Sequence, residues 1–428
     1  MKAVRGTRDL LPPETALWSR IEATARAVFA RYNFGEIRTP IFEDTSLFAR
    51  GVGEETDIVS KEMYTWEDRA RAQSEKAQSL TLRPENTAGV VRAYIEHKLG
   101  ESGQLQKLFY IGPQFRRERP QKGRYRQFSQ IGAEVLGPPS AGSESPLRDA
   151  EVLEMLVTLL DELGIRGWTL HVNSVGSASD REGYNAALRA ALEPVAAKMC
   201  PDCQRRAVTN PLRVLDCKVP EDQPIIDTLP VISDSLGEDS KAHFDAVLEA
   251  LDAAGVPYTR NHRLVRGLDY YTRTTFEFTH GGLGAQSALL GGGRYDGLTE
   301  MIGGPKAPGI GFAMGQDRLV LTLLAQESAA LEVLADAYIA PLGESVNAAA
   351  LALARELRRQ GLKIELGDGS FRLKKSFEAG NKTARKIVIL GEDELTSGIL
   401  TVKDFASGEQ KKIPRSELAA HLRGPAGL

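Results

Sequence analysis

Apolar residues near the start of the chain recur at the spacing of an α-helix. Across residues 14–32 they fall mostly three or four positions apart, at Leu17, Ile21, Ala25, Val28, Phe29 and Tyr32. Residues at this spacing share one face of a helix with 3.6 residues per turn. Pro12 and Pro13 precede the stretch, and proline is favoured at a helix start. We therefore predict an amphipathic helix over residues 14–32.

Shorter stretches rich in β-forming residues follow. Residues 37–42 favour a strand interrupted by Pro40, which lacks the N–H that a sheet ladder needs and therefore fits an edge or a bend. Residues 108–111 and 128–135 predict two further strands, with Gly and Pro at their ends. Residues 67–79 are polar and without period, and residues 137–143 are rich in Gly, Pro and Ser, so both predict surface loops.

A strongly basic segment joins the second and third of these strands. Residues 116–126 hold six cations and one carboxylate, with a turn signal at residues 120–123, so we predict a β-hairpin with a basic loop. Such a loop repels itself unless anions lie among its guanidinium groups, and the planar fork of arginine matches phosphate or carboxylate. Phe115, Tyr125 and Phe128 interleave with the charges, which suits stacking on a base. A solvated run of charge is the alternative.

The middle of the chain has a helical pattern. Residues 179–182 fit a capping box that opens a helix over residues 184–197, and residues 241–254 predict a second helix that ends at Gly255. Because β-rich sequence returns at residues 272–278, we interpret residues 175–258 as an inserted, mainly helical domain.

From about Ala335 strand and helix patterns alternate. We predict strands at 337–341, 363–366 and 386–390 and helices at 345–360 and 371–383, which is typical of a small α/β domain. This region holds fifteen Lys and Arg against twelve Asp and Glu, and six of the cations fall between Arg372 and Lys386 with only Glu378 opposing them. The basic stretch is either a solvated helix face or a contact for RNA.

The bulk composition is that of a water-soluble globular protein. The chain has 428 residues, of which 42% are hydrophobic and 26% charged, and its net charge is −3. No run of eighteen apolar residues is present, and the first residues resemble neither a secretory signal nor a transit peptide, so we expect no membrane contact and a cytoplasmic location. The slight acidity argues against a protein that coats nucleic acid, so any RNA contact must use local patches.

Three cysteines, Cys200, Cys203 and Cys217, form a Cys-x-x-Cys pair and a third member after thirteen intervening residues. This spacing indicates a possible zinc site, but a closed structural site needs four ligands. No histidine lies close by in the sequence, and Asp216 is a poor fourth ligand. We therefore expect ordinary reduced thiols and no bound metal, with zinc as the alternative.

Two further segments combine glycine with functional side chains. Residues 309–319, GIGFAMGQDRL, nearly match the dinucleotide-binding fingerprint, but the third glycine comes one place late and no fitting βαβ unit surrounds it. Residues 291–296, GGGRYD, offer backbone that could approach a ligand closely or simply form a flexible turn. No Walker A segment is present, which argues against the common parallel-sheet nucleotide sites.

The basic hairpin also carries a resemblance. Its sequence FRRERPQKGRYRQF (residues 115–128) resembles the second signature motif of class II aminoacyl-tRNA synthetases in its histidyl form. The resemblance implies that Arg116 contacts the α-phosphate of ATP and the amino-acid carboxylate, that Glu118 meets the adenine edge and that Phe128 stacks on the adenine ring.

The first and third motifs of the same class are also recognisable. RTPIFE (residues 38–43) is similar to the first motif, which implies a homodimer interface, although a plain edge-strand proline fits the residues equally well. GIGFAMGQDRL is similar to the third motif, a strand that runs into a helix, and implies that Arg318 lies over the adenine and near the γ-phosphate. The tail from residue 335 resembles the anticodon-binding domain and implies tRNA as a partner.

The segment VRGLDYY (residues 265–271) resembles histidyl-tRNA synthetases specifically. It implies that Arg266 contacts the α-phosphate and carboxylate opposite Arg116, so that these two residues are the catalytic pair, and that Tyr271, next to Tyr270, reaches an imidazole nitrogen of the substrate. In the same way, residues 81–87, TLRPENT, and the following strand imply a set of contacts to the α-ammonium and the imidazole N–H. These are Glu85, Thr87 and Gln130 for the ammonium and Glu134 for the imidazole; Asn86 stands where the family commonly has glycine.

Together the motifs define one expectation for fold and function. The resemblance implies an α+β class II synthetase. Its catalytic domain, an antiparallel sheet flanked by helices, would cover residues 1–330 and be interrupted by a helical insertion at 175–258. An α/β anticodon-binding domain would cover residues 331–428. The resemblance also implies a ligase that joins L-histidine to tRNA(His) through histidyl-adenylate, with ATP as substrate and Mg²⁺ as cofactor. The alternatives are a regulatory subunit that senses histidine without catalysis and a class II synthetase for another amino acid.

Overall fold

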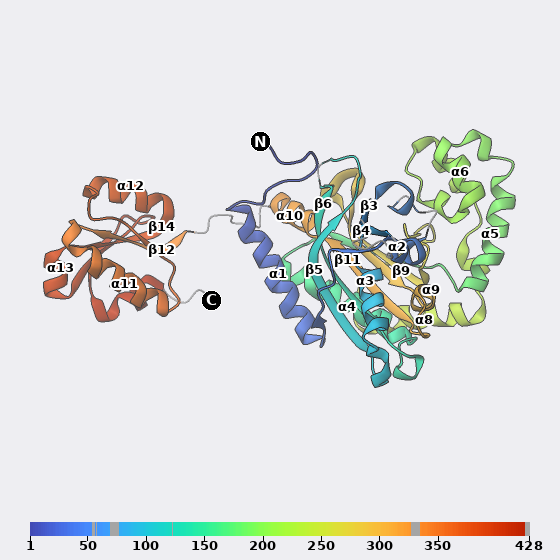
Figure 1. Ribbon diagram of the computed structural model, residues 1–428, viewed down its shortest axis with the longest axis horizontal. Coiled ribbons are helices and arrows are strands. Elements are labelled where there is room, and N and C mark those ends of the chain that lie inside the picture. Colours follow the sequence, from blue (N-terminus) through green and yellow to red (C-terminus); the bar gives the residue numbers. More distant parts are fainter. Residues whose placement is uncertain (54–55, 57, 69–76, 122, 327–333, 424–428) are drawn as a thin grey trace. The chain divides into compact units, whose positions relative to one another are not determined.

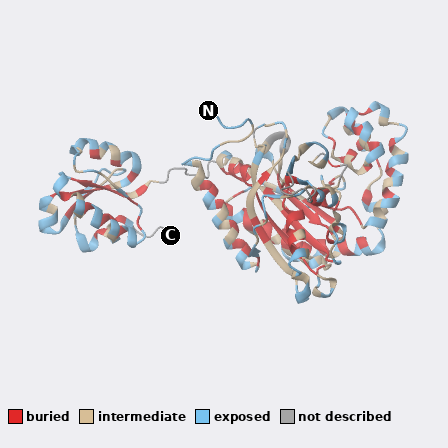
Figure 2. Ribbon diagram, in the orientation of Figure 1, coloured by how far each residue is buried: buried red, intermediate tan, exposed pale blue. Residues whose placement is uncertain are grey.

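The computed structural model describes residues 1–423 except 54–55, 57, 69–76, 122 and 327–333, and gives no side-chain detail for 284–286. The chain folds into two compact units, Met1–Ala329 and Ala330–Leu428 (Figure 1). In each unit the buried residues concentrate in a central sheet and on the inner faces of its helices (Figure 2). No helix of the described residues is long and apolar enough to cross a bilayer.

The first unit is built on an eight-stranded sheet. Only the two outermost pairs are parallel, and all inner pairs are antiparallel. The order of the strands across the sheet is β1 (Gly35–Glu36), β5 (Gln106–Phe115), β6 (Gln127–Leu136), β11 (Gly309–Gly315), β10 (Ala288–Arg294), β9 (Thr272–His280), β7 (Trp168–Ser174) and β8 (Thr259–Arg260). The predicted hairpin is confirmed, because β5 and β6 pair antiparallel on either side of the basic loop.

Helices cover one face of this sheet. They are α1 (Glu14–Arg31), α4 (Pro146–Leu163), α8 (Glu238–Ala253) and α10 (Gln316–Ala325), which pack against one another and on the sheet. The ring of Phe29 in α1 lies 6.1 Å from that of Phe312 in β11. Ala133 is the register partner of Phe312 on β6. Successive residues of a strand point to opposite faces, so Gln130 and Glu134 project from the other face of the sheet.

A smaller layer borders the opposite face. It contains α2 (Thr45–Val52), α3 (Thr87–Glu96), α9 (Leu298–Ile302) and a three-stranded sheet in the order β2 (Phe42–Asp44), β4 (Gln78–Leu82), β3 (Tyr64–Asp68). Short helical segments complete the unit outside the helical region described below: η1 (Ile58–Glu62), η2 (Leu99–Ser102), η3 (Pro139–Ala141) and η8 (Gly281–Gln286).

Outside the helical region, two predictions for this unit need correction. Residues 37–42 do not form one strand, since β1 ends at Glu36 and β2 begins at Phe42. The guanidinium of Arg83 donates to the carbonyl oxygens of Thr39 at 2.9 Å and Pro40 at 3.3 Å, so this backbone is satisfied by a side chain instead of a neighbouring strand. The loop predicted at 67–79 is also shorter at both ends, because β3 includes residues 67 and 68 and β4 includes 78 and 79. Residues 69–76 lie outside the described residues.

The helical region has a core of its own. Its elements are α5 (Ala178–Leu192), η4 (Ala196–Lys198), α6 (Pro201–Thr209), η5 (Pro211–Asp216), η6 (Pro220–Asp222), α7 (Gln223–Ile226) and η7 (Ile232–Ser235) (Figure 1). Buried residues from Val175 to Ile232, together with Val265, form one cluster. The cap of α5 is Ser177, paired with Asp180, and not Ser179. Its helix also ends at Leu192, five residues before the predicted end. By contrast α8 packs against α4 and β9 of the main sheet.

The second unit is the predicted α/β arrangement extended by a hairpin. Its sheet has the order β13 (Ile364–Leu366), β12 (Ala335–Pro341), β14 (Ala384–Leu390), β15 (Ile399–Asp404), β16 (Gln410–Pro414). The first three strands are parallel, β15 pairs antiparallel with β14, and β16 pairs antiparallel with β15. The helices are α11 (Asn347–Arg359), α12 (Leu373–Thr383), α13 (Glu392–Ser397) and α14 (Leu418–Arg423), with the short segments η9 (Glu344–Val346) and η10 (Arg415–Glu417).

Candidate active site

An open cavity of about 1060 Å³ lies beside the face of the main sheet from which Gln130 and Glu134 project. Side chains from β6, from the basic loop, from the segment before β9 and from the start of α10 line it. All eleven site residues expected from the sequence are in its wall: Glu85, Thr87, Arg116, Glu118, Phe128, Gln130, Glu134, Arg266, Tyr270, Tyr271 and Arg318. Segments more than 200 residues apart in the chain therefore contribute to one site.

Glu134 forms the most buried part of the wall. Its side chain has no exposed surface. The hydroxyl of Thr87 donates to its Oε1 at 2.7 Å and the hydroxyl of Tyr295 donates to its Oε2 at 2.6 Å. Burial, the largest influence, raises the pKa of Glu134 to about 8. These neutral hydroxyl donors lower the pKa only in part, so the carboxyl of the ligand-free protein is mostly protonated at neutral pH.

Glycine makes room for this carboxylate. Gly311 is the register partner of Glu134 on β11. A Cβ on Gly311 would lie 1.7 Å from Glu134 Oε2, far inside van der Waals contact. Gly291 on β10 does the same for Arg266, whose guanidinium would meet a Cβ at 2.5 Å. The glycines of residues 291–293 and 309–311 thus allow functional side chains to lie flat on the sheet.

Glu85 is held at the start of α3. The backbone N–H groups of Thr87 and Ala88 donate to its two carboxylate oxygens at 2.7 and 3.0 Å. Burial still raises the pKa of Glu85, and these backbone donors lower it in part. Asn86, where the resemblance led us to expect glycine, has φ −116°, a conformation open to any residue. The substitution therefore leaves the turn unstrained.

Arg116 follows β5 directly and enters the basic end of the cavity. Its Nε donates to the carbonyl oxygen of Pro84 at 2.9 Å, and its guanidinium carbon lies 5.2 Å from the centroid of the Phe128 ring. Glu118 pairs with Arg124 at 3.1 Å and lies 3.9 Å from Arg116. The loop thus balances part of its own charge while the cationic edge of Arg116 remains in the cavity wall.

Arg266 approaches the same cavity from the segment before β9. Its Nη1 donates to Glu277 Oε2 on β9 at 2.7 Å. Its Nε is buried and, among the described residues, has no hydrogen-bond partner; the same holds for Oε1 of Gln130. Buried polar atoms of this kind are rare in folded proteins unless a ligand or water satisfies them. Their position in the wall of the cavity indicates a polar ligand there.

Arg318 lies at the start of α10, where its Nη1 donates to the carbonyl oxygen of Ala288. Burial is the main cause that lowers the pKa of the Arg318 guanidinium, and the neighbouring cations Arg124 and Arg116 lower this pKa further. Repulsion among cations that line one cavity is relieved by an anion, so Arg116, Arg124, Arg266 and Arg318 define an anion-binding end.

The structure adds residues that the motifs did not single out. Tyr295 reaches Glu134, Glu277 holds Arg266, and Tyr125 and Asp317 line the cavity and contact Arg8. Tyr295 follows directly after GGGR, and nothing in the sequence indicated that it contacts Glu134, 161 positions away. Conversely Arg294 of the same motif lies outside the cavity wall and is fully buried, where its Nε donates to Asp149 of α4 at 3.1 Å.

The cavity therefore has two chemically different ends. One holds buried carboxyls and tyrosine hydroxyls, which suit a ligand with nitrogen donors. The other holds four guanidinium groups and an aromatic ring, which suit a polyphosphate and a flat base. Such a site can bring a small amine-bearing substrate against a nucleoside phosphate.

Comparisons with known proteins identify the family of both units. A family model described as "Histidyl-tRNA synthetase" matches residues 6–319, and one described as "Anticodon binding domain" matches residues 336–424. The histidine–tRNA ligase of Koribacter versatilis (strain Ellin345) is 71% identical over 424 residues, which cover 99% of this chain and 96% of the relative. That of Solibacter usitatus (strain Ellin6076) is 56% identical over 424 residues and covers 99% of both chains.

A solved structure shares the fold. The crystal structure of apo S. aureus histidyl-tRNA synthetase is 38% identical, covers 99% of this chain and 100% of that chain, and superposes with a TM-score of 0.79. The class II α+β fold expected from the motifs is thereby confirmed. Because a family model matches most of the chain and these relatives align from end to end, the chain belongs to the histidyl-tRNA synthetase family.

Proposed function

We propose that this histidine–tRNA ligase makes histidyl-adenylate in the cavity described above and then transfers the histidyl group to the 3′ end of tRNA(His). The observation that carries the proposal is the arrangement of Arg116 and Arg266, which line one cavity together with the buried carboxyls of Glu85 and Glu134. A histidine with its carboxylate toward the arginines and its nitrogens toward the carboxyls fits this polarity.

The first step is attack by a carboxylate oxygen of histidine on the α-phosphorus of ATP. The new bond joins this oxygen to the α-phosphorus. The bond between the α-phosphorus and the oxygen that bridges to the β-phosphorus breaks, and pyrophosphate leaves. Two anions must approach, and negative charge spreads over the phosphorus in the transition state. Arg116 and Arg266 stabilise that charge from fixed positions, so catalysis consists of positioning and charge neutralisation. The attacking carboxylate is already ionised, so no general base is needed.

The buried end of the cavity selects histidine. Glu134 accepts the imidazole N–H and Tyr271 contacts the other imidazole nitrogen, while Glu85, Thr87 and Gln130 receive the α-ammonium. An amino acid without the imidazole would leave Glu134 buried without a donor from the ligand, which is costly. Tyr295 and Tyr270 complete the wall around these groups.

The basic end holds ATP. Arg318 lies over the adenine and near the γ-phosphate, Glu118 accepts from the adenine edge, and Phe128 offers a ring face for stacking. Mg²⁺ supplies further charge neutralisation on the phosphate oxygens when it is bound. Glu277 beside Arg266 is the carboxylate that would hold it, and its oxygen donors suit this hard cation.

The second unit would bind the anticodon of tRNA(His), and the chain would act in the cytoplasm as a homodimer. The first-motif region supports the dimer, because Ile41 and Phe42 within it are 45% and 52% exposed and Trp66, whose ring lies 6.0 Å from that of Phe42, is 40% exposed. Large apolar side chains gathered on a surface favour an interface. Light scattering of the purified chain would show a mass of about two chains if this holds, and a monomer mass at micromolar concentration would contradict it.

The decisive experiment is histidine-dependent exchange of pyrophosphate with ATP. We expect exchange with histidine and none with the other amino acids, followed by esterification of tRNA(His). A regulatory subunit that only senses histidine would bind the amino acid without exchange. Histidine binding in the absence of exchange, with ATP and Mg²⁺ present, would therefore contradict the proposal.

A further inference from the structure

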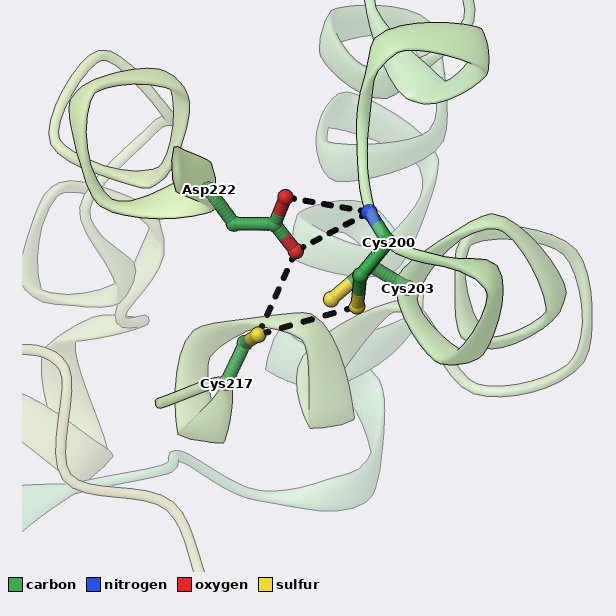
Figure 3. Close-up of side chains that lie close together, drawn as sticks. All are labelled: Cys200, Cys203, Cys217 and Asp222. Carbon is green, nitrogen blue, oxygen red and sulfur yellow. Dashed lines mark hydrogen bonds between the residues drawn. The ribbon is translucent and has the colours of Figure 1, made fainter. Parts of the chain in front are cut away.

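A second cluster of reactive side chains lies in the helical region, away from the cavity wall. The sulfur atoms of Cys200, Cys203 and Cys217 and a carboxylate oxygen of Asp222 all lie within 4.8 Å of one another. Figure 3 shows the four side chains converging from three segments of backbone. Cys203, Cys217 and Asp222 are buried and Cys200 is partly exposed.

The spacing of these atoms matches tetrahedral coordination. A zinc ion about 2.3 Å from each sulfur separates two sulfur ligands by about 3.8 Å, and a sulfur from an oxygen ligand by about 3.5 Å. Cys200 Sγ and Cys217 Sγ lie 3.9 Å apart, and Cys217 Sγ lies 3.3 Å from Asp222 Oδ2. The other pairs of these atoms lie within 4.8 Å, so movement of the side chains inward would place one ion at the centre of the four atoms.

The fourth ligand comes from a residue that the sequence did not indicate. Asp216, the nearest carboxylate before Cys217, is partly exposed and pairs with Lys218 at 3.5 Å. Asp222 is 1% exposed, and its Oδ1 accepts from the backbone N–H of Cys200 at 3.0 Å. The turn made by η6 brings this carboxylate back to the cysteines, which sequence spacing alone does not reveal.

Backbone donors surround the cluster as they do in structural metal sites. The N–H of Val219 points to Cys217 Sγ at 3.4 Å. Cys200 is the N-cap of the nine-residue helix α6, Pro201 begins the helix and Cys203 lies in its first turn. The positive end of the helix and the N–H groups stabilise thiolate charge and fix the orientation of the ligands.

We propose that Cys200, Cys203, Cys217 and Asp222 bind one structural Zn²⁺. Three soft thiolates and one carboxylate in a closed tetrahedron suit zinc better than hard cations such as Mg²⁺. Each thiol that coordinates the metal releases its proton to solvent. The site has no open position, so its role is to hold the fold together.

The ion would close a loop that reaches the active site. Residues 204–216 lie between Cys203 and Cys217 and contain Arg213, whose Nη1 donates to the carbonyl oxygen of Arg266 at 2.9 Å. Asn210 in the same loop donates to Asp269 Oδ1 at 3.0 Å. Zinc would therefore brace the contacts through which the helical region supports the segment that carries Arg266 and Tyr271.

Metal content of the full-length chain tests the site directly. The protein is purified without a histidine tag and without chelator, and its metals are measured by mass spectrometry. We expect about one zinc per chain. Replacing the zinc with Co²⁺ should give the intense visible absorption of tetrahedral cobalt together with a thiolate charge-transfer band. A chain that folds without metal, whether with three thiols reactive toward a thiol reagent or with a disulfide between two of them, would overturn the proposal.

Matched variants identify the ligands. Cys217→Ser and Asp222→Asn should each weaken zinc retention against a competing chelator at least about tenfold, whereas Asp216→Asn should retain zinc like the wild type. Circular dichroism of each variant reports whether it still folds. If a variant does not fold, the cobalt spectrum of the unsubstituted protein still tests the metal site. Unchanged zinc retention in Cys217→Ser would overturn the site, and unchanged retention in Asp222→Asn would overturn the carboxylate as its fourth ligand.

Discussion

The side chain of Arg213 in η5 donates a hydrogen bond of 2.9 Å to the main-chain carbonyl oxygen of Arg266. Arg266 in turn holds Glu277 of the main sheet at 2.7 Å. The helical region is thus joined to the catalytic sheet through the backbone of the arginine that we place at the α-phosphate. Arg181 of α5 adds a second link, with 2.7 Å from its Nη1 to the carbonyl oxygen of Tyr271.

Arg213→Ala should slow adenylate formation without removing any group from the cavity wall. The backbone of Arg266 loses a fixed donor, and small displacements of a catalytic group are costly in rate. We expect roughly a tenfold lower kcat for pyrophosphate exchange with a smaller change in KM for histidine. Arg205→Ala, a substitution on the exposed face of α6, serves as the control. Wild-type kcat in Arg213→Ala would show that the link does not position Arg266.

Arg266→Ala should lower adenylate formation by about two to four orders of magnitude, because one of two fixed cations at the α-phosphate is lost. The substitution also leaves the carboxylate of Glu277 without its partner. The double variant Arg266→Ala/Glu277→Ala separates the two effects, and Arg260→Ala on the exposed strand β8 is the control. Near-full exchange activity in both Arg266 variants would remove this arginine from the mechanism.

Tyr271→Phe should raise the KM for histidine more than the KM for ATP. Burial raises the pKa of the Tyr271 phenol, so its hydroxyl stays a neutral hydrogen-bond partner for an imidazole nitrogen. Steady-state exchange with each substrate varied in turn measures the two constants. Tyr258→Phe, outside the cavity wall, should leave both unchanged. Equal losses for histidine and ATP in Tyr271→Phe would contradict the imidazole contact.

Glu134→Gln should change how the stability of the ligand-free protein depends on pH. The folded-state pKa of Glu134 is raised to about 8 from an ordinary value of 4.5, so the folded state binds more protons than the unfolded state between these values. This contribution to the free energy of unfolding is full below about pH 4.5 and is lost as the pH rises toward 8. Glutamine has no such dependence.

Urea unfolding of both proteins at pH 5.5 and pH 8 measures this effect. The stability of Glu134→Gln relative to the wild type should increase by at least about 1 kcal/mol between the two conditions. A difference that stays constant with pH would mean that Glu134 is already ionised in the ligand-free protein. Added histidine should reduce the wild-type loss at pH 8, because the imidazole N–H favours the carboxylate.

Removal of the second unit should spare adenylation more than tRNA charging. The chain divides at residues 329 and 330 into compact units with separate cores, so a chain ending at residue 329 should fold. We expect pyrophosphate exchange within a few-fold of the full chain and a much larger loss in the rate of tRNA aminoacylation. The isolated second unit should bind tRNA weakly in a salt-dependent manner. Unchanged charging by the truncated chain would mean that the second unit has no role in tRNA binding.

Local patterns predicted well where neighbours in sequence are also neighbours in space. The helix over residues 14–32 is confirmed to within one residue, and the hairpin around the basic loop is confirmed with a first strand longer than predicted, because helical spacing and a single turn decide them. The strand predicted at residues 37–42 was wrong, because the side chain of the distant Arg83 donates a hydrogen bond to the backbone carbonyl of Thr39 in this stretch. The hairpin of β15 and β16 lay beyond the patterns that we interpreted, and it joins the sheet through the pairing of β15 with β14.

The sequence by itself determined the local elements, the motifs and, through the motifs, the family and the eleven residues that line one cavity. Only the tertiary structure decided how burial acts on them: that Glu134 is deep enough for its pKa to rise to about 8, that Tyr295 meets it, and that Asp222 and not Asp216 completes the cysteine cluster. Periodicity and spacing describe a chain within a few turns. Desolvation and coordination depend on which distant segments pack together, and that is settled only when the whole unit folds.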